Sequence, residues 1–322
     1  MALGEFELIG RYFQRPGRRA GPQVVQDIGD DCALLQPAAG MQLAISCDML
    51  VEGRHFFPDV NPAALGHKAL AVNLSDLAAC GASPLAFTLA LALPAADETW
   101  LTAFSRGLFA LADAHGCNLI GGDTTRGPLN ICITVFGQTP NGTALLRSGA
   151  RAGDEVWVSG TLGDACLALQ ARRGQINMPP AALEAAQQRL DWPTPRLALG
   201  QALRGVASAA IDVSDGLVGD LGHILQASGV GATLDTEKVS GLLASPQIEG
   251  QRRLDFTLAG GDDYELLFTA SASASAQVQS AGRQAGVPVT RIGRIEAQAG
   301  LRLIDGHGQL LSGHFAAFDH FR

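Results

Sequence analysis

The alternation of hydrophobic and polar positions in the first half of the chain predicts short strands separated by amphipathic helices. Leu43, Ile45 and Cys47 alternate with polar or small residues, as in a strand, and this strand delivers Asp48 at its end. The same reasoning predicts strands near residues 87–93, 119–121 and 131–137, and helices over 5–13, 62–79 and 98–115. Strands and helices that alternate in this way indicate a layered α/β domain.

The second half of the chain repeats this pattern after a segment rich in Gly and Arg at residues 148–153. We therefore expect one domain over 1–148 and a second over 149–322, in an α/β (α+β) fold. Strands are expected at 156–158, 209–211 and 265–269, and helices at 164–173, 181–189, 196–204, 217–227 and 270–286.

The helix expected over residues 62–79 carries an acidic residue among its apolar positions. Leu65, Ala69, Val72 and Asp76 follow one another at i, i+4, i+7 and i+11, so they share the stripe that faces the core. A carboxylate there requires a hydrogen-bond partner or a metal ion. This placement favours a functional Asp76 over a purely structural one.

Glycine and aspartate recur together at four places in the chain, residues 29–31, 121–127, 212–216 and 260–263. Adjacent glycines let backbone N–H groups approach a ligand closely, and carboxylates offer hard oxygen ligands to a divalent cation. Each group alone could be a turn with a capping Asp. Their recurrence favours one shared site for a polyphosphate that carries magnesium.

Two of these groups leave an alternative open. Asp30 and Asp31 alternate sides if the chain is extended, so only one of them is expected to bind a metal ion, and Asp30 is favoured. Asp212 and Asp215 lie three residues apart at the start of a helix, so Asp215 is either a ligand or the helix cap.

Charge and lysine content narrow the possible partners. The formal net charge is −8, and neither Lys nor Arg forms a run, which argues against nucleic-acid and anionic-membrane partners. Lys68 and Lys238 are the only lysines, and neither stands in a phosphate-loop or protein-kinase motif. Bound phosphates would therefore be balanced by metal ions, backbone amides and arginines.

Cysteine usage points to a reducing compartment. The six cysteines are widely spaced, form no C-x-x-C pair and have mostly apolar neighbours, so we expect reduced core residues. No charged-then-apolar signal segment precedes Gly4, and the longest apolar run, near 87–93, is too short to span a bilayer. We expect a cytoplasmic protein.

Five ordered motifs together resemble those of the thiamine-monophosphate kinase family. They stand at residues 28–33, 73–79, 121–124, 211–217 and 260–266. The similarity extends from residues 4–6 to residues 318–321, which is nearly the whole chain.

The resemblance implies a kinase that moves the γ-phosphoryl group of ATP, its co-substrate, onto the phosphate of thiamine monophosphate, in the last step of thiamine diphosphate biosynthesis. It also implies several Mg²⁺ ions and a homodimer whose N-terminal sheets meet, with a C-terminal α/β domain beside each ATP site. The acceptor phosphate has a second pKa of about 6, so it needs no general base to become a nucleophile.

The resemblance also assigns residues. Metal ligands map onto Asp30, Ser46, Cys47, Asp48, Asp76, Asp123, Asp212 and Asp215, and Asp48, Asp76 and Asp123 are the expected catalytic residues. Nucleotide contacts map onto Gly122, Asp123, Arg147, Ser214 and Arg106, and substrate contacts onto His55, Asp262 and Phe318. The family usually has Thr at position 47, where the backbone oxygen is the ligand, and more often Glu at position 262.

Three other functions are compatible with the same residues. One is a related ATP-dependent enzyme with a different acceptor, and another is a metal-dependent phosphohydrolase, which carboxylate-held metals could equally serve. The third is a non-catalytic module that binds ATP with magnesium. Product analysis separates them, because only the kinase requires thiamine monophosphate to form ADP.

Overall fold

The computed structural model describes residues 4–15 and 20–311, and the chain forms two compact units. The first unit comprises Met1–Leu77 and Ala82–Gly142, and the second comprises Ala78–Gly81 and Thr143–Arg322. The main segment of the second unit thus begins at Thr143, a few residues before the expected domain boundary at 148. The roles assigned to the two predicted domains stay predictions at this point.

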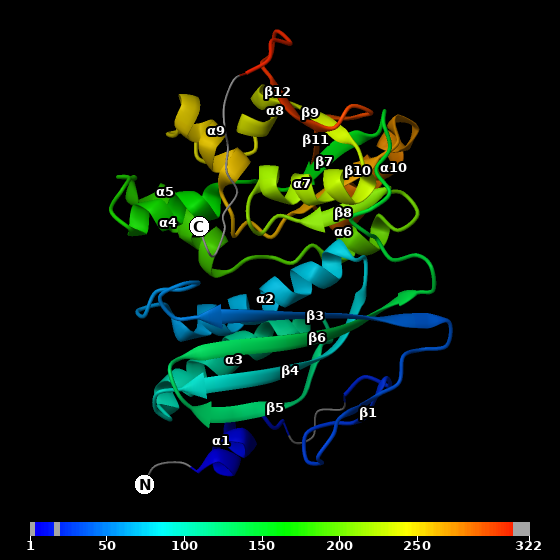
Figure 1. The fold of residues 1–322 in the computed structure, drawn as a ribbon. Coiled ribbons are helices and arrows are strands. Elements are labelled where there is room, and N and C mark those ends of the chain that lie inside the picture. Colours follow the sequence, from blue (N-terminus) through cyan, green and yellow to red (C-terminus); the bar gives the residue numbers. More distant parts are fainter. Residues whose placement is uncertain (1–3, 16–19, 312–322) are drawn as a thin grey trace. The chain divides into compact units, whose positions relative to one another are not determined.

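The first unit is built on a four-stranded mixed sheet (Figure 1). Its strands, in spatial order, are β3 (Met41–Val51), β6 (Asn130–Pro140), β4 (Ser83–Leu93) and β5 (Asn118–Arg126). β6 pairs antiparallel with both β3 and β4, whereas β4 and β5 are parallel. β3 and β5 are therefore the two edges of the sheet.

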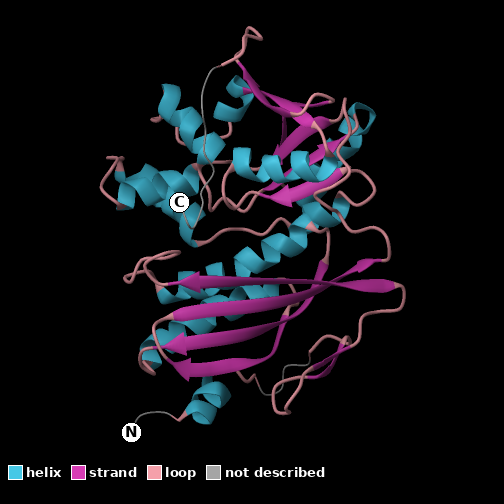
Figure 2. Ribbon diagram, in the orientation of Figure 1, coloured by secondary structure: helices cyan, strands magenta, loops and turns pink. Residues whose placement is uncertain are grey.

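Two helices, α2 (Pro62–Ala79) and α3 (Glu98–Ala114), lie along one face of this sheet (Figure 2). Asn61 starts α2, since its side-chain oxygen accepts the N–H of Ala63 at 2.9 Å, and Pro62 supplies the first helical φ angle. The expected stripe of α2 is buried, as Leu65 and Ala69 show. Asp76 on that stripe is half-buried.

The opposite face of β3 is apolar and exposed. Leu43, Ile45 and Met49 are 42, 60 and 54% exposed, and Cys47 lies between them on the same side of the strand. Three smaller elements complete the described part of this unit: α1 (Glu5–Tyr12), β1 (Val24–Gln26) and β2 (Leu34–Leu35). A long edge strand with an apolar exposed face is a surface that associates with another sheet.

The second unit contains a six-stranded sheet with helices around it (Figure 1). In spatial order its strands are β12 (Gly300–Ile304), β9 (Gly231–Asp235), β11 (Val289–Glu296), β7 (Glu155–Ser159), β10 (Leu266–Ala270) and β8 (Ala209–Asp212). Its α-helices are α4 (Asp164–Arg172), α5 (Pro180–Asp191), α6 (Leu197–Ala202), α7 (Leu217–Ser228), α8 (Thr236–Ser240), α9 (Gly250–Ala259) and α10 (Ser275–Ala285). One hydrophobic core, with Val156, Ile211 and Leu267 among its members, lies between the sheet and α7.

Several strand ends differ from the sequence-based expectation. Asp48 was expected to end its strand, but β3 continues to Val51 because every residue from Met41 onward pairs with β6. β5 was expected to stop at Gly121, but it pairs with β4 as far as Arg126. Pairing with the neighbouring strands determines where β3 and β5 end, and this pairing cannot be inferred from a single sequence. The elements that were not predicted are β1, β2, β9, α8, α9, β11 and β12.

The cysteines are less buried than expected. Of the six, all of which the structure describes, Cys117 is buried whereas Cys32 and Cys47 are exposed. All six are free thiols. Among the described helices, none combines the length and apolar character that crossing a bilayer requires.

Candidate functional site

A pocket of about 780 Å³ in the first unit brings together two of the Gly/Asp groups. Asp30 and Asp31 line it from the segment before β2, and Gly122 and Asp123 line it from β5. Apolar residues of α1, among them Phe6 and Ile9, form another part of its wall. Carboxylates and a glycine backbone therefore share one concave surface, which suits a ligand that combines phosphates and a cation.

Glycine is required at position 122 by close backbone approach. Its φ angle is 147°, and a Cβ atom there would lie 1.9 Å from the carbonyl oxygen of Leu89 on the neighbouring strand. The pairing shifts register nearby, since Phe87 pairs with Leu119 and Thr88 with Gly121, which leaves one extra residue on β5. The Gly-Gly-Asp segment is thus part of an edge strand, and the alternative of a tight turn is wrong.

Asp30 and Asp31 both line this pocket. The Oδ1 atom of Asp30 accepts the backbone N–H of Asp31 at 2.8 Å, which fixes the Asp30 side chain next to the following peptide. The choice of Asp30 over Asp31 as the metal ligand stays a prediction.

A second acidic group lies where β3 packs on α2. The hydroxyl of Ser46 donates to Oδ2 of Asp76, and the side-chain oxygen of Asn73 accepts the N–H of Asp48 at 3.1 Å. These contacts connect the strand to the helix through polar groups. Ser46, Asp48 and Asp76 are therefore close together, as the predicted metal site requires. In the turn after β3, Nδ1 of His55 accepts the N–H of Val51 at 3.0 Å.

The Cys47 side chain points to the other face of β3. Its Sγ atom lies 3.4 Å from Sγ of Cys132 on β6. Partial burial and the neighbouring Cys47 raise the pKa of the Cys132 thiol to about 11. The Cys47 thiol therefore faces away from Ser46 and Asp48, and the backbone oxygen of Cys47 as a metal ligand stays a prediction.

The two acidic groups of the first unit stand at opposite edges of the sheet. Asp48 pairs with Ile133, Ile133 pairs with Leu89, and Leu89 pairs with Gly122, so Asp48 and Gly122 lie in one row across the four strands. Three strand spacings separate the ends of such a row by about 14 Å. Within one chain, Asp48 and Asp123 are therefore too far apart to bind the same metal ion.

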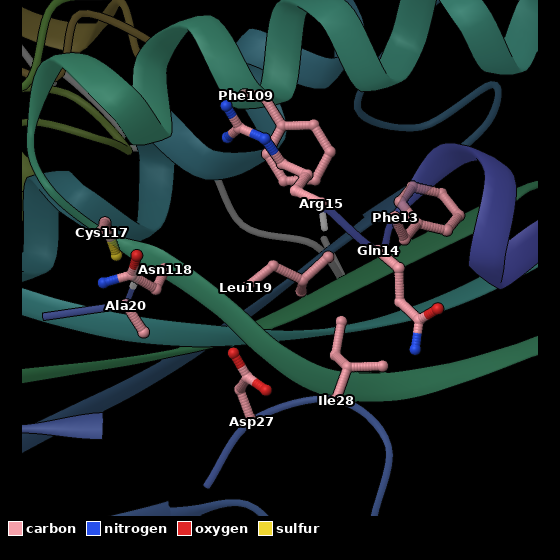
Figure 3. A pocket seen from close by; sticks show the side chains of 10 residues that line it. All are labelled: Phe13, Gln14, Arg15, Ala20, Asp27, Ile28, Phe109, Cys117, Asn118 and Leu119. Carbon is pink, nitrogen blue, oxygen red and sulfur yellow. The ribbon is translucent and has the colours of Figure 1, made fainter. Parts of the chain in front are cut away.

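A smaller pocket, of about 360 Å³, adjoins the first and shares Phe13 and Ile28 with it (Figure 3). Arg15 lies against the ring of Phe109 there, 4.5 Å from its centroid, and pairs with Asp113 through two hydrogen bonds of 2.7 Å. Burial lowers the pKa of Arg15, which stays charged at neutral pH. In contrast to Arg15, the predicted nucleotide contact Arg106 lies on the exposed side of α3, away from the lining of both pockets.

In the second unit, Asp212 is the last residue of β8, and the loop from β8 to α7 carries Ser214 and Asp215. Asp212 is 5% exposed, and the other two are half-buried. The N-cap of α7 is Gly216, so the alternative in which Asp215 caps the helix is wrong. Oδ2 of Asp220 instead accepts the N–H groups of Ser214, Asp215 and Gly216 at 3.1–3.2 Å.

Asp220 was not predicted as a site residue. It is 2% exposed, and burial together with the charge of Asp215 raises its pKa to about 7. An acidic residue in the first turn of a helix is common, so the sequence alone does not indicate that the Asp220 side chain binds the loop before α7. Its three hydrogen bonds fix the backbone that presents Ser214 and Asp215.

The segment 262–265 lies against this loop. The N–H groups of Asp262 and Tyr264 donate to the carbonyls of Ser214 and Val213, each at 2.8 Å, and Val213 donates to the carbonyl of Glu265 at 2.8 Å. Two of the four Gly/Asp groups are thereby joined through their backbones.

Two fully buried acids anchor this segment. Oε1 of Glu265 accepts a hydrogen bond from Arg189 at 2.7 Å, and its carboxylate is also held by Arg196 and by the hydroxyl of Ser159. Oδ2 of Asp263 accepts the N–H of Gly163 at 2.8 Å, and its other oxygen has no partner among the described residues. Burial holds the pKa of Asp263 well above its usual range.

Two predicted contacts and the metal ligands remain to be placed. Arg147 is exposed in the loop before β7, and Phe318 lies outside the described residues. Within residues 4–15 and 20–311, no three His, Cys, Asp or Glu side chains lie close enough to hold a metal ion by themselves. Any bound ion would therefore need further oxygen ligands.

Comparisons with known proteins agree with this architecture. Residues 29–139 match the family "AIR synthase related protein, N-terminal domain", and residues 151–306 match "AIR synthase related protein, C-terminal domain". The chain is 49% identical over 325 residues to the thiamine-monophosphate kinase of Salmonella typhimurium, covering 100% of this chain and 99% of that one.

Two solved structures are similar throughout most of the chain. The thiamine-monophosphate kinase from Stenotrophomonas maltophilia K279a has a TM-score of 0.82 and 47% identity, over 88% of this chain and 91% of its own. The structure described as "AaThiL complexed with AMPPCP and TMP" has a TM-score of 0.77 and 30% identity, over 89% of each chain.

Proposed function

Because the chain belongs to the thiamine-monophosphate kinase family, we propose that it transfers the γ-phosphoryl group of ATP to the phosphate of thiamine monophosphate, giving thiamine diphosphate and ADP. The observation that carries this proposal is the 49% identity over the whole chain. The similar structure complexed with AMPPCP, an ATP analogue, and TMP supports both substrates. The enzyme is thus a phosphotransferase with a phosphate acceptor, in the last step of thiamine diphosphate biosynthesis.

We propose Mg²⁺ as the metal, held in the first unit by Asp30, Asp123, Asp48 and Asp76. The carboxylates of the pocket and of the β3–α2 contact fit this ion, since Mg²⁺ takes one or two carboxylates and completes its shell with water and substrate phosphates. Clusters of three acidic side chains are therefore not required. When bound, the ions neutralise phosphate charge and so reduce the repulsion between two anionic reactants.

The residues of the chain would position the two substrates. In our proposal, the glycine backbone of β5 approaches the nucleotide phosphates at Gly122, and Ser214 and Arg147 are further nucleotide contacts. His55, Asp262 and Phe318 bind thiamine monophosphate. No general base is assigned, because the acceptor phosphate is largely dianionic at neutral pH.

We further propose that the protein is a homodimer and that each active site takes residues from both copies. Within one chain, Asp48 and Asp123 stand at opposite edges of the sheet. A single copy therefore does not bring the two acidic groups together. The exposed apolar face of β3, with Leu43, Ile45 and Met49, offers a surface for a second sheet. A two-fold dimer through this face could place β5 of one copy beside β3 of the other.

Paired variants test the shared site. Asp76→Asn and Asp123→Asn, each inactive alone, are co-expressed with different tags, and the heterodimer is isolated through both tags. A shared site predicts about half of the wild-type activity, because one of the two sites in a two-fold dimer then contains both native carboxylates. An inactive heterodimer would show instead that each site is formed within one copy.

All six free thiols support a cytoplasmic location, which we add to the proposal. Oxidising compartments favour paired cysteines in proteins.

Product analysis tests the proposed reaction. The protein is incubated with ATP and Mg²⁺, and with thiamine monophosphate or thiamine as the acceptor, and thiamine diphosphate and ADP are quantified by chromatography. We expect equal amounts of both products with thiamine monophosphate and neither product with thiamine. Inorganic phosphate released without acceptor would identify a phosphohydrolase, and nucleotide binding without turnover would identify a binding module.

A further inference from the structure

The backbone is strained on both sides of Asp263. Asp262 has a φ angle of 67° and Tyr264 one of 52°, and these are the two non-glycine residues with positive φ in the described part of the chain. Asp tolerates this region, whereas a bulky residue such as Tyr rarely adopts it. Such strain persists where surrounding contacts fix it, and it gathers at functional sites.

Neighbouring groups hold this strained segment in place. The N–H groups of Asp262 and Tyr264 are bonded to Ser214 and Val213, and the intervening Asp263 is 1% exposed with one oxygen on the N–H of Gly163. These contacts hold the backbone at Asp262 and Tyr264 and the side chain at Asp263. Their effect is to bring the side chains of Asp262 and Tyr264 together.

The two side chains are joined directly. The hydroxyl of Tyr264 donates to Oδ1 of Asp262 at 3.0 Å. Tyr264 is 9% exposed and the bond is partly buried, and a hydrogen bond to a carboxylate is stronger than one between neutral groups. Asp262 is half-buried and remains accessible to a ligand. The phenol therefore sets the direction in which the carboxylate is presented.

We infer that Tyr264 is a positioning residue that orients the Asp262 carboxylate toward the cationic thiazolium ring of thiamine monophosphate. The inference rests on the proposed function and on the predicted contact between Asp262 and the substrate. A carboxylate that is already oriented binds a cation without first losing its own rotational freedom. Tyr264 acts through Asp262 and does not itself touch the substrate.

Steady-state kinetics of Tyr264→Phe tests the inference. This substitution removes one hydroxyl and retains the buried ring. We expect the KM for thiamine monophosphate to rise about tenfold, which is the size of effect that losing a hydrogen bond to a charged group produces. We expect kcat and the KM for ATP to stay unchanged. A general loss of structure would change all three.

Tyr12→Phe provides the matched control. Tyr12 is the other tyrosine of the chain, and its hydroxyl is buried without a hydrogen-bond partner among the described residues. We expect wild-type kinetics from this variant.

The double variant Tyr264→Phe/Asp262→Ala distinguishes a positioning role from an independent one. If Tyr264 acts through Asp262, adding Tyr264→Phe to Asp262→Ala leaves the KM for thiamine monophosphate where Asp262→Ala alone puts it. An additional rise by the same factor as in the wild-type background would overturn the inference. So would a wild-type KM in Tyr264→Phe, or a Tyr264→Phe variant whose kcat falls together with its melting temperature.

The outcome for Tyr264 is separate from the outcome for the proposed function. If the wild-type enzyme forms no thiamine diphosphate, the proposed function fails. If it does and Tyr264→Phe matches it, only the positioning role fails.

Discussion

Replacing Asp76 by Asn is expected to lower kcat by about 100-fold or more while the fold is retained. Asp76 lies on α2 beside Ser46 of β3, whose hydroxyl donates to its Oδ2 atom. Asn keeps the shape and the hydrogen bond but lacks the charge that holds a divalent cation. The measurement is the rate of thiamine diphosphate formation at saturating ATP, thiamine monophosphate and Mg²⁺, together with circular dichroism of the variant.

Asp97→Asn is the control for this prediction. Asp97 is the N-cap of α3 in the same unit, where Oδ1 accepts the N–H groups of Thr99 and Trp100 at 2.8 and 3.1 Å. Asn caps a helix about as well as Asp, so this variant should keep full activity. If Asp76→Asn retains near-normal activity as well, Asp76 is a structural carboxylate satisfied by Ser46.

Glu265→Ala is expected to lower the free energy of unfolding of the second unit by about 3–5 kcal/mol. Glu265 is fully buried, and its carboxylate pairs with Arg189 and Arg196, whose side chains are 22 and 15% exposed. Removing the acid leaves two largely buried guanidinium groups without a counter-charge. Thermal unfolding followed by circular dichroism should show a fall in Tm of about 10 °C.

Glu296→Ala is the matched comparison, because Glu296 forms an exposed ion pair with Arg294 on β11. Exposed pairs contribute about 0–1 kcal/mol, so its Tm should barely move. Equal melting temperatures for the two variants would mean that the Glu265 network contributes little, and that its buried arginines find other partners.

Periodicity was sufficient to place Asp76. The spacing of Leu65, Ala69 and Val72 set the buried stripe of α2, and the structure puts Asp76 on that stripe beside β3. The helix start was equally local, since Asn61 and Pro62 act within one turn. Features set by a few neighbouring residues can be derived from one sequence.

Features that depend on strand pairing could not be derived in this way. The strand order puts Asp48 and Asp123 at opposite edges of one sheet, although both were expected in one site. The Gly121–Asp123 segment lies in a strand because β4 pairs with it. Neither the order of strands nor their pairing can be inferred from the alternation of apolar residues alone.

Asp220 and Tyr264 show a third limit of prediction from the sequence. Both act on a neighbouring segment through hydrogen bonds, Asp220 on residues 214–216 and Tyr264 on Asp262. Neither belongs to a residue type and spacing that indicates a ligand. Their importance depends on burial and on the backbone conformation, which only the folded chain reveals.

The central claim is that dispersed carboxylates hold the metal ions that carry the ATP phosphates. Electron paramagnetic resonance of Mn²⁺, titrated into the protein with and without AMPPCP, tests it most directly. We predict tight Mn²⁺ binding to the wild type that requires the nucleotide, and fewer or weaker bound ions in Asp76→Asn. Identical binding by the wild type and Asp76→Asn, or no nucleotide-dependent binding at all, would contradict the account.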